Sequence, residues 1–349
     1  MSPVNVAVVG VGNCAAALIQ GVDYYADNAH GSLGLTNPTC GGYTVADIRF
    51  SAAFDVDVSK VGRDLSEAIW IKPNNALKFA DVPHLGVAVD DGILADGLGR
   101  GLAERIPARG EASVERVAER LRETQTDVVV NLIPTGGQRA SELYAEAALH
   151  AGCAFVNCIP STIARSVEWA DKFRAAGLPL TGDDLKSQFG STLVHRALME
   201  LLANNGVEVR TTYQIVGGGN MDFLNLVDPE RVASKRETKV QGFSGPGERP
   251  TGEHFGAEFI SFLGDRKTAF MRLDGEAFGG TSFELELRMS VEDSPSAAGN
   301  ILDAVRYMKL ALDRGIGGVV DPVSLQLMKA PPAPSAVEEA LNWKGFPAR

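Results

Sequence analysis

Apolar residues in the first half of the chain fall into short unbroken runs separated by longer amphipathic stretches. Unbroken runs are typical of parallel strands buried on both faces, whereas the amphipathic stretches have the period of a helix. Strands are expected at 4–9, 48–54, 127–133, 154–157 and 179–181. Helices are expected at 14–25, 60–69, 114–124 and 167–176. This β-α-β-α order predicts a doubly wound parallel sheet through about residue 182.

The pattern changes after residue 186, where alternation with one exposed face becomes the main signal. The expected elements are a helix at 187–203, strands at 208–216, 267–273 and 281–291, a Gly/Pro-rich loop at 241–253, and a long helix at 296–314. We therefore divide the chain into three parts, at 1–186, 187–292 and 293–349. The middle part is expected to be a partly antiparallel α+β module.

The first strand runs into the turn Gly10-Val11-Gly12, and a helix starts directly after it. In a dinucleotide site the first free N–H groups of such a helix point at a pyrophosphate. Ala15 replaces the third glycine of G-x-G-x-x-G, which is permitted where the helix packs on the strand. The segment predicts a dinucleotide site at Gly10 and Gly12, with an ordinary strand-to-helix turn as the alternative.

In the ordinary dinucleotide fold an acidic residue at the end of the second strand holds the adenosine ribose. Asp55 is the positional candidate, and Asp64 is a second. Asp55 follows the glycines by about 40 residues, because a loop rich in Gly, Asn, Pro and Thr lies at 28–43. Ligands bind beyond the carboxyl ends of parallel strands. Segments 134–137, 158–162 and 182–186 are therefore expected on the ligand side.

Composition excludes some classes of partner. The 349 residues are 45% hydrophobic, enough for a sizeable core, and the net charge of −11 argues against general affinity for nucleic acid or an anionic membrane. A local basic pocket still permits a phosphorylated small molecule. The four cysteines form no C-x-x-C and no zinc spacing, as in a reducing compartment. The apolar start is assigned to the first strand and not to a leader, so we expect a cytoplasmic protein.

Several polar segments carry groups suited to an anionic ligand. They are Gly182-Asp183-Asp184-Leu185-Lys186-Ser187, Gly217-Gly218-Gly219-Asn220-Met221-Asp222, Ser234-Lys235-Arg236-Glu237-Thr238-Lys239 and Asp265-Arg266-Lys267. Ammonium groups stabilise phosphate or a developing oxyanion, and glycines at a strand end often mark close approach to a ligand. Each segment also has an ordinary alternative: a helix cap, a hairpin or a solvated surface. Together they predict an NAD(P)-dependent enzyme or regulator acting on a negatively charged compound.

Segments over nearly the whole chain resemble the myo-inositol-1-phosphate synthases, in particular their shorter actinobacterial branch. The matching stretches are VGVGNCAAALIQGVDYY, FDVDVSKVGRDLSEAI, GDDLKSQFGSTLVHR, GGNMDFLNL, ERVASKRETK, EDSPSAAGNILDAVR, DRGIGG and LMKAPP. They occur in the family's order, and GDDLKS together with GNMDFLNL is specific to it. The glycine turn alone would not identify the family.

The resemblance implies a Rossmann-type NAD-binding domain at 1–186, an inserted α+β catalytic and tetramerisation domain at 187–292, and a C-terminal helix and tail at 293–349 that return to the first domain. It implies that D-glucose 6-phosphate is cyclised to 1L-myo-inositol 1-phosphate by C5 oxidation, enolisation, intramolecular aldol closure and re-reduction. The cofactor ends as it began, so such an enzyme is an isomerase. A homotetramer, a divalent metal ion in some members, and a role in making inositol lipids or inositol-derived thiols are also implied.

The resemblance also assigns residues. On the substrate side it implies catalytic roles for Lys186, Lys235, Lys239, Lys267, Lys309, Asp184 and Asp265. On the cofactor side it implies Gly12, Asn13, Cys14, Asp64, Thr124, Thr135, Tyr144, Ser187 and Asp222, with Lys235 at the border. Three alternatives stay open: a related cyclase of another sugar phosphate, a net dehydrogenase, and an inactive NAD-binding regulator.

Overall fold

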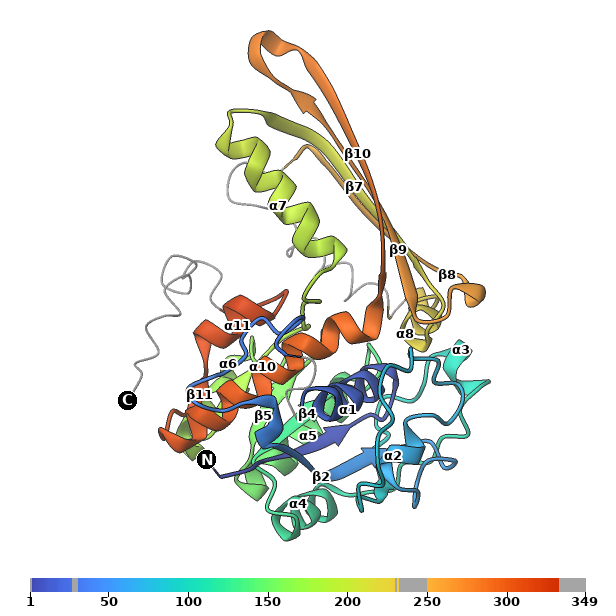
Figure 1. Ribbon diagram of the computed structural model, residues 1–349, viewed down its shortest axis with the longest axis vertical. Helices are drawn as coiled ribbons and strands as arrows, with labels where there is room; N and C mark the ends of the chain where they lie inside the picture. The colour runs from blue at the N-terminus through green and yellow to red at the C-terminus, as the bar shows by residue number, and fades with distance from the viewer. Residues whose placement is uncertain (1, 27–30, 230, 232–249, 333–349) are drawn as a thin grey trace.

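The computed structural model describes residues 2–26, 31–229, 231 and 250–332, and Figure 1 shows its two sheets. Within these residues the larger sheet has seven parallel strands in the order β11-β6-β5-β4-β1-β2-β3. They are β1 Val4–Val9, β2 Ile48–Asp55, β3 Val89–Asp91, β4 Val128–Asn131, β5 Ala154–Asn157, β6 Pro179–Thr181 and β11 Gly318–Val319. The expected doubly wound parallel sheet is confirmed.

Helices cover both faces of this sheet, which is why its strands are apolar without alternation. The helices of this part are α1 Asn13–Tyr25, α2 Leu65–Ala68, α3 Arg100–Ala103, α4 Val114–Glu123, α5 Gln138–Ala151, α6 Val167–Ala176, α10 Asp293–Asp313 and α11 Asp321–Leu327, with a 3-10 turn at Val45–Asp47. Successive strand residues point to opposite faces. Val4 and Val6 therefore pack in the layer with α1 and α10, while Ala7 packs with α4 and α5.

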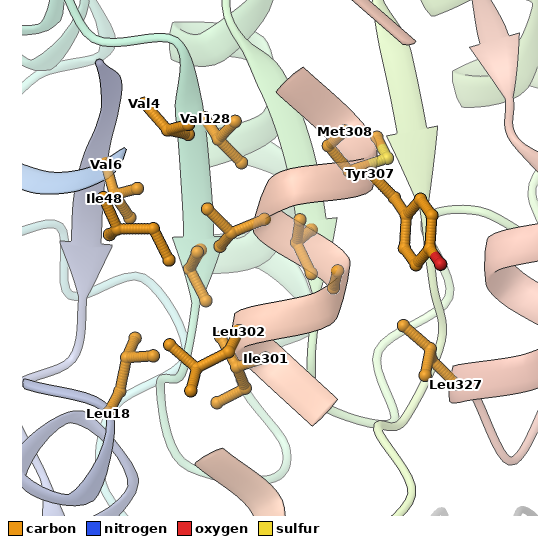
Figure 2. Packing of buried hydrophobic residues seen from close by; sticks show 14 of the residues in the cluster. Val4, Val6, Leu18, Ile48, Val128, Ile301, Leu302, Tyr307, Met308 and Leu327 are labelled. Carbon is orange, nitrogen blue, oxygen red and sulfur yellow. The ribbon is translucent and has the colours of Figure 1, made fainter. Parts of the chain in front are cut away.

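Figure 2 shows the first of these layers, in which Leu18 of α1 and Ile301 and Leu302 of α10 pack with strand residues. Helix α10 thus forms part of the core of the larger sheet, although it follows the second module in sequence. Helix α11 contributes Leu327 to the same layer. The segment after the second module is therefore built into the first sheet.

The second sheet extends away from the first (Figure 1) and has four strands among the described residues, in the order β10-β9-β7-β8. Its elements are α7 Ser191–Asn204, β7 Glu208–Gly218, α8 Met221–Asn225, β8 Gly252–Phe259, β9 Arg266–Glu276 and β10 Ser282–Glu292, with 3-10 turns at Ser261–Leu263 and Phe278–Gly280. β7 pairs with β8 in parallel, and the other pairs are antiparallel. Helix α7 packs against this sheet, where His195 is hydrogen-bonded to Thr212 of β7 at 2.7 Å.

Some expected elements differ from the observed ones for local physical reasons. The helix expected at 60–69 is limited to Leu65–Ala68, because Asp64 caps it and the residues before it form turns around Asp57. The helix expected from 187 begins at Ser191, since Gly190 is extended at φ −151°. β8 begins inside the stretch expected to be a loop at 241–253, of which only 250–253 lie in the described residues.

Candidate functional site

A pocket lies at the carboxyl ends of β1, β2, β4 and β5, the edge where parallel sheets bind ligands. It reaches from the glycine turn after β1 to the base of the second module and to the segment after α11. The described lining residues include Gly10, Gly12, Asn13, Cys14, Asp55, Thr135, Tyr144, Asp184, Ser187, Asp222, Lys267, Asp293 and Lys329. Residues far apart in the sequence are therefore brought together at one site.

The glycine turn gives the pocket a bare backbone wall. Gly10 has φ +88°, and an added Cβ would lie 2.8 Å from the carbonyl oxygen of Leu132, so that only glycine fits. Gly12 differs, because a Cβ there would meet none of the described atoms within 4 Å. Gly12 is also the N-cap of α1. The start of α1 therefore faces open pocket, in the arrangement by which helix N–H groups bind phosphate.

Asp55 lines the pocket as its sequence position predicts, but its carboxylate is hydrogen-bonded to backbone amides of the protein. Oδ2 accepts a hydrogen bond from the amide of Val11 at 2.7 Å, and Oδ1 accepts one from the amide of Asp57 at 2.8 Å. The ammonium group of Lys60 lies 3.7 Å from Asp55 and donates to the carbonyl of Val11 at 2.9 Å. The peptide groups on both sides of Val11 are thus fixed by an ion pair, which shapes the glycine turn.

Other side chains expected to face a cofactor also line the pocket. Thr135 in the turn after β4 donates to Asp222 of α8 at 3.1 Å, which joins the two modules across the site. The hydroxyl of buried Tyr144 accepts from the amide of Ile93 at 2.7 Å. Burial, with Asp293, Asp265 and Asp222 nearby, raises the pKa of the Cys14 thiol to about 12. Cys14 is therefore a neutral thiol in the wall at neutral pH.

A buried carboxylate beside the pocket ties the glycine turn to the second module. Oδ1 of Asp265 accepts hydrogen bonds from Asn13 at 2.9 Å, Asn220 at 3.0 Å and Ser294 at 2.9 Å. Burial raises the pKa of Asp265 to about 6, with Asp293 adding to the shift, although the donors from Asn220, Asn13 and Ser294 oppose it. The three donors come from the start of α1, from the N-cap of α8 and from the first turn of α10.

Lys267 and Lys329 bring ammonium groups to the pocket from two different parts of the chain. Lys267 at the start of β9 is paired with Asp293 at 2.9 Å. Lys329, after α11, donates to Oδ1 of Asp184 and to the carbonyl of Leu185, each at 2.7 Å. Ammonium groups held in a pocket are suited to stabilise phosphate or a negatively charged oxygen that develops during a reaction.

Comparison with known proteins decides the family. A sequence profile described as myo-inositol-1-phosphate synthase matches residues 190–294. Inositol-3-phosphate synthase of Corynebacterium glutamicum is 46% identical over 342 residues, covering 95% of this chain and 94% of that protein. The chain belongs to the myo-inositol-1-phosphate synthase family. Inositol-3-phosphate synthase of Mycobacterium tuberculosis is 46% identical over 335 residues, covering 94% of this chain and 91% of that protein. The crystal structure of Ari2 matches with a TM-score of 0.81 and 35% identity over 97% of this chain and 96% of that one.

Two lysines for which the family resemblance implies catalytic roles are not among the described residues that line the pocket. Lys309, near the end of α10, pairs with Asp127 at 3.1 Å and Asp313 at 2.9 Å. Asp127 precedes β4, so Lys309 lies at the amino ends of the strands, opposite the pocket. Lys186 is not among the described lining residues, and its ammonium group donates to the backbone carbonyls of Leu325 and Gln326.

Two expected cofactor ligands also lie elsewhere. Asp64 caps α2, where its carboxylate accepts hydrogen bonds from the amides of Ser66, Leu85 and Val87. Thr124 follows α4 and donates to the carbonyl of Arg120 at 2.8 Å, at the amino end of β4. Neither residue is in the described wall of the pocket. Lys235 and Lys239 lie outside the described residues.

Sequence reasoning missed three positively charged residues of the pocket wall: Lys60, Arg231 and Lys329. Arg231 donates to the carbonyl of Thr135 at 2.9 Å. The signal for Lys329 was present, because it belongs to the matching stretch LMKAPP of the synthase family. No local pattern separates it from a surface lysine. Only its pairing with Asp184, 145 residues away, marks it as part of the site.

Within the described ranges, no three His, Cys, Asp or Glu side chains are grouped so that they could hold a metal ion. Among the helices of the described part, none has the length and apolar character needed to cross a membrane.

Proposed function

We propose that the protein converts D-glucose 6-phosphate to 1L-myo-inositol 1-phosphate, as an NAD-dependent isomerase without net oxidation. One observation carries the proposal: the glycine turn and the ammonium groups of Lys267 and Lys329 share one pocket. Relatives 46% identical over more than nine-tenths of their length are named inositol-3-phosphate synthase, which agrees with it. The family relationship and the geometry thus point to the same chemistry.

The glycine-turn end of the pocket is proposed to bind the dinucleotide. The open space above Gly12 admits a phosphate group close to the first N–H groups of α1. A bound NAD⁺ would supply the hydride acceptor for oxidation at C5 of the sugar and the hydride donor for the later reduction. The residues proposed to hold it are Gly10, Gly12, Asn13, Cys14, Thr135, Tyr144, Ser187 and Asp222, with Asp55 acting through the backbone of Val11.

The lysines supply positive charge where the sugar becomes negative. An enolate and an aldol alkoxide both carry charge on oxygen, and a fixed ammonium group stabilises them more than it stabilises the uncharged carbonyl oxygens from which they form. Lys267 and Lys329 are proposed for this role, since their carboxylate partners Asp293 and Asp184 fix their positions. Asp265 is proposed to keep Asn13 and Ser294 in place. Lys235 and Lys239 are kept in the proposal on the family pattern alone.

The test is to incubate the pure protein with D-glucose 6-phosphate deuterated at C5 and with NAD⁺. The expected product is an inositol monophosphate that retains the deuterium, without accumulation of NADH. Steady accumulation of NADH would instead indicate a net dehydrogenase. Bound nucleotide without turnover would indicate an inactive regulator. Turnover of another sugar phosphate in place of this one would indicate a related cyclase.

We further propose a cytoplasmic homotetramer that supplies inositol phosphate for inositol lipids or inositol-derived thiols. The second sheet exposes apolar side chains, including Ile215 of β7 and Phe270 of β9, paired across neighbouring strands. An apolar sheet face of this kind is suited to pack against another copy. Light scattering on the purified protein measures the assembly, and a monomeric mass would contradict it.

A further inference from the structure

The side chain of Arg231 joins two segments of the pocket wall that belong to the larger sheet. Its Nη1 donates to the carbonyl of Thr135 at 2.9 Å, in the turn after β4. Its Nη2 donates to the carbonyls of Gly97 at 3.3 Å and Asp96 at 3.4 Å, in the segment between β3 and α3. Because Arg231 follows α8, a residue of the second module holds both segments at once.

The segment between β3 and α3 has a second anchor on α5. The carboxylate of Asp96 accepts hydrogen bonds from the amides of Arg139 at 2.9 Å and Ala140 at 2.8 Å, in the first turn of that helix. These amides lack partners within the helix, so a carboxylate is well suited to cap them. Residues 94–98 all line the pocket, and this stretch of wall is therefore held by α5 and by Arg231 together.

Two glycines leave the space that the guanidinium occupies. A Cβ on Gly136 would lie 2.8 Å from Nη1 of Arg231, and a Cβ on Gly99 would lie 3.1 Å from its Nε. Asn225 of α8 also donates to the carbonyl of Thr135, at 2.7 Å. The contact between the second module and the turn after β4 is thus close-packed and made by two donors on one carbonyl.

We infer that Arg231 is a positioning residue that clamps residues 94–98 to the turn at 134–137 and thereby slows the release of reduced cofactor. The inference rests on the proposed function, in which the sugar is oxidised and later reduced without net oxidation. A pocket that serves such a reaction must keep NADH in place between the two steps, since its loss would leave an oxidised sugar phosphate behind. Arg231 acts through the backbone of the wall, whereas Lys267 and Lys329 are proposed to act on the sugar.

The variants Arg231→Met and Arg231→Lys test this, with Arg116→Met as the matched control. Arg116 is an exposed residue of α4 that pairs with Glu119 at 2.7 Å. Lysine keeps the positive charge of Arg231, but it has one compact ammonium group in place of a planar fork. It should therefore hold one segment of the wall and not both.

The rate of NADH release gives a readout that does not depend on turnover. Stopped-flow displacement, followed by NADH fluorescence, should show release about 10- to 100-fold faster in Arg231→Met than in the wild type. Release should be nearly as fast in Arg231→Lys and unchanged in Arg116→Met. In cofactor-free protein, the amides of Arg139 and Ala140 should exchange faster in Arg231→Met, because their acceptor Asp96 has lost one of its anchors. A thermal melt checks that each variant is folded.

Turnover of C5-deuterated D-glucose 6-phosphate in the presence of unlabelled NADH shows the consequence for the reaction. The inositol phosphate made by Arg231→Met should lose part of its deuterium, whereas the product of the wild type and of Arg116→Met should keep it. NADH release in Arg231→Met within about twofold of the wild type would overturn the inference. A wild-type release rate in Arg231→Lys would also overturn it, since the charge alone would then suffice. If the wild type makes no inositol phosphate, the proposed function fails, while the release and exchange rates still decide the clamp.

Discussion

The substitution Gly12→Ala should separate cofactor affinity from stability. An added Cβ at Gly12 meets none of the described atoms within 4 Å, and the backbone there, at φ −92° and ψ −161°, suits alanine. Replacing glycine by alanine reduces the conformational freedom of the unfolded chain, which stabilises the folded protein by about 0.4–1 kcal/mol. Alanine is a poorer N-cap than glycine by roughly the same amount. The free energy of unfolding should therefore change by less than about 1 kcal/mol.

The affinity for NAD⁺ should respond to Gly12→Ala quite differently from the stability. The same methyl group would stand where the proposed cofactor's pyrophosphate would approach the first N–H groups of α1. Losing one charged hydrogen bond of this kind costs about 1.5–3 kcal/mol. The Kd for NAD⁺ should therefore rise by about 10- to 150-fold. Titration calorimetry with NAD⁺ measures this change, and a thermal melt of the same preparation checks the fold.

Gly10→Ala is the matched contrast. Gly10 has φ +88°, and its added Cβ would lie 2.8 Å from a backbone oxygen that cannot move freely. The left-handed conformation costs alanine about 1–2 kcal/mol, and the overlap adds to it, so about 2–4 kcal/mol of stability should be lost. If Gly12→Ala binds NAD⁺ as tightly as the wild type, the cofactor does not pass over this turn, and the assignment of the site is refuted.

Three further results are expected. Lys329→Met should lower kcat about 10²- to 10³-fold, as loss of one oxyanion donor does, while calorimetry shows unchanged NAD⁺ binding; full activity would remove Lys329 from the mechanism. Since the folded pKa of Asp265 is raised from 3.8 to about 6, the folded state binds this proton more tightly, and stability should fall by up to about 3 kcal/mol as pH rises from 4 to 6. Urea titrations should show a weaker pH dependence in Asp265→Asn, and an equal one would contradict the assignment. Finally, Cys14, Cys40 and Cys153 should resist iodoacetamide at pH 8 until the protein unfolds, because burial raises the pKa of each to about 12; mass spectrometry showing rapid labelling of the folded protein would refute this.

Several strands and helices of the larger sheet could be predicted because their signals are local, although the very short strands β3 and β11 were not predicted. The strand at Ala154–Asn157 and the helix at Val167–Ala176 were predicted with the observed bounds, since one is a buried run and the other has a clear helical period. β8 could not be predicted in this way. Its residues do not alternate cleanly between buried and half-buried positions, and its parallel partner β7 lies more than 40 residues earlier.

The site residues also divide into those that a local sequence pattern predicts and those that it does not. The glycine turn and Asp55 were found from local pattern, but the choice between Lys309 and Lys329 depends on where α10 points. Its first residues, Asp293 and Ser294, are at the pocket. At 1.5 Å per residue, Lys309 lies about 24 Å further along the axis. A helix that spans the whole sheet carries its far end to the opposite edge, which no helical pattern reveals.

The direct passage of β10 into α10 has a mechanical consequence. The strand ends at Glu292 and the helix begins at Asp293, with no loop between them. Swinging of the second module against the first would thus have its axis at this junction, and the amide of Asp293 is anchored there to the carbonyl of Asp265 at 3.0 Å. Residues near this junction, such as Lys267, would move little during such a rotation, and the residues of the second module furthest from it would move most.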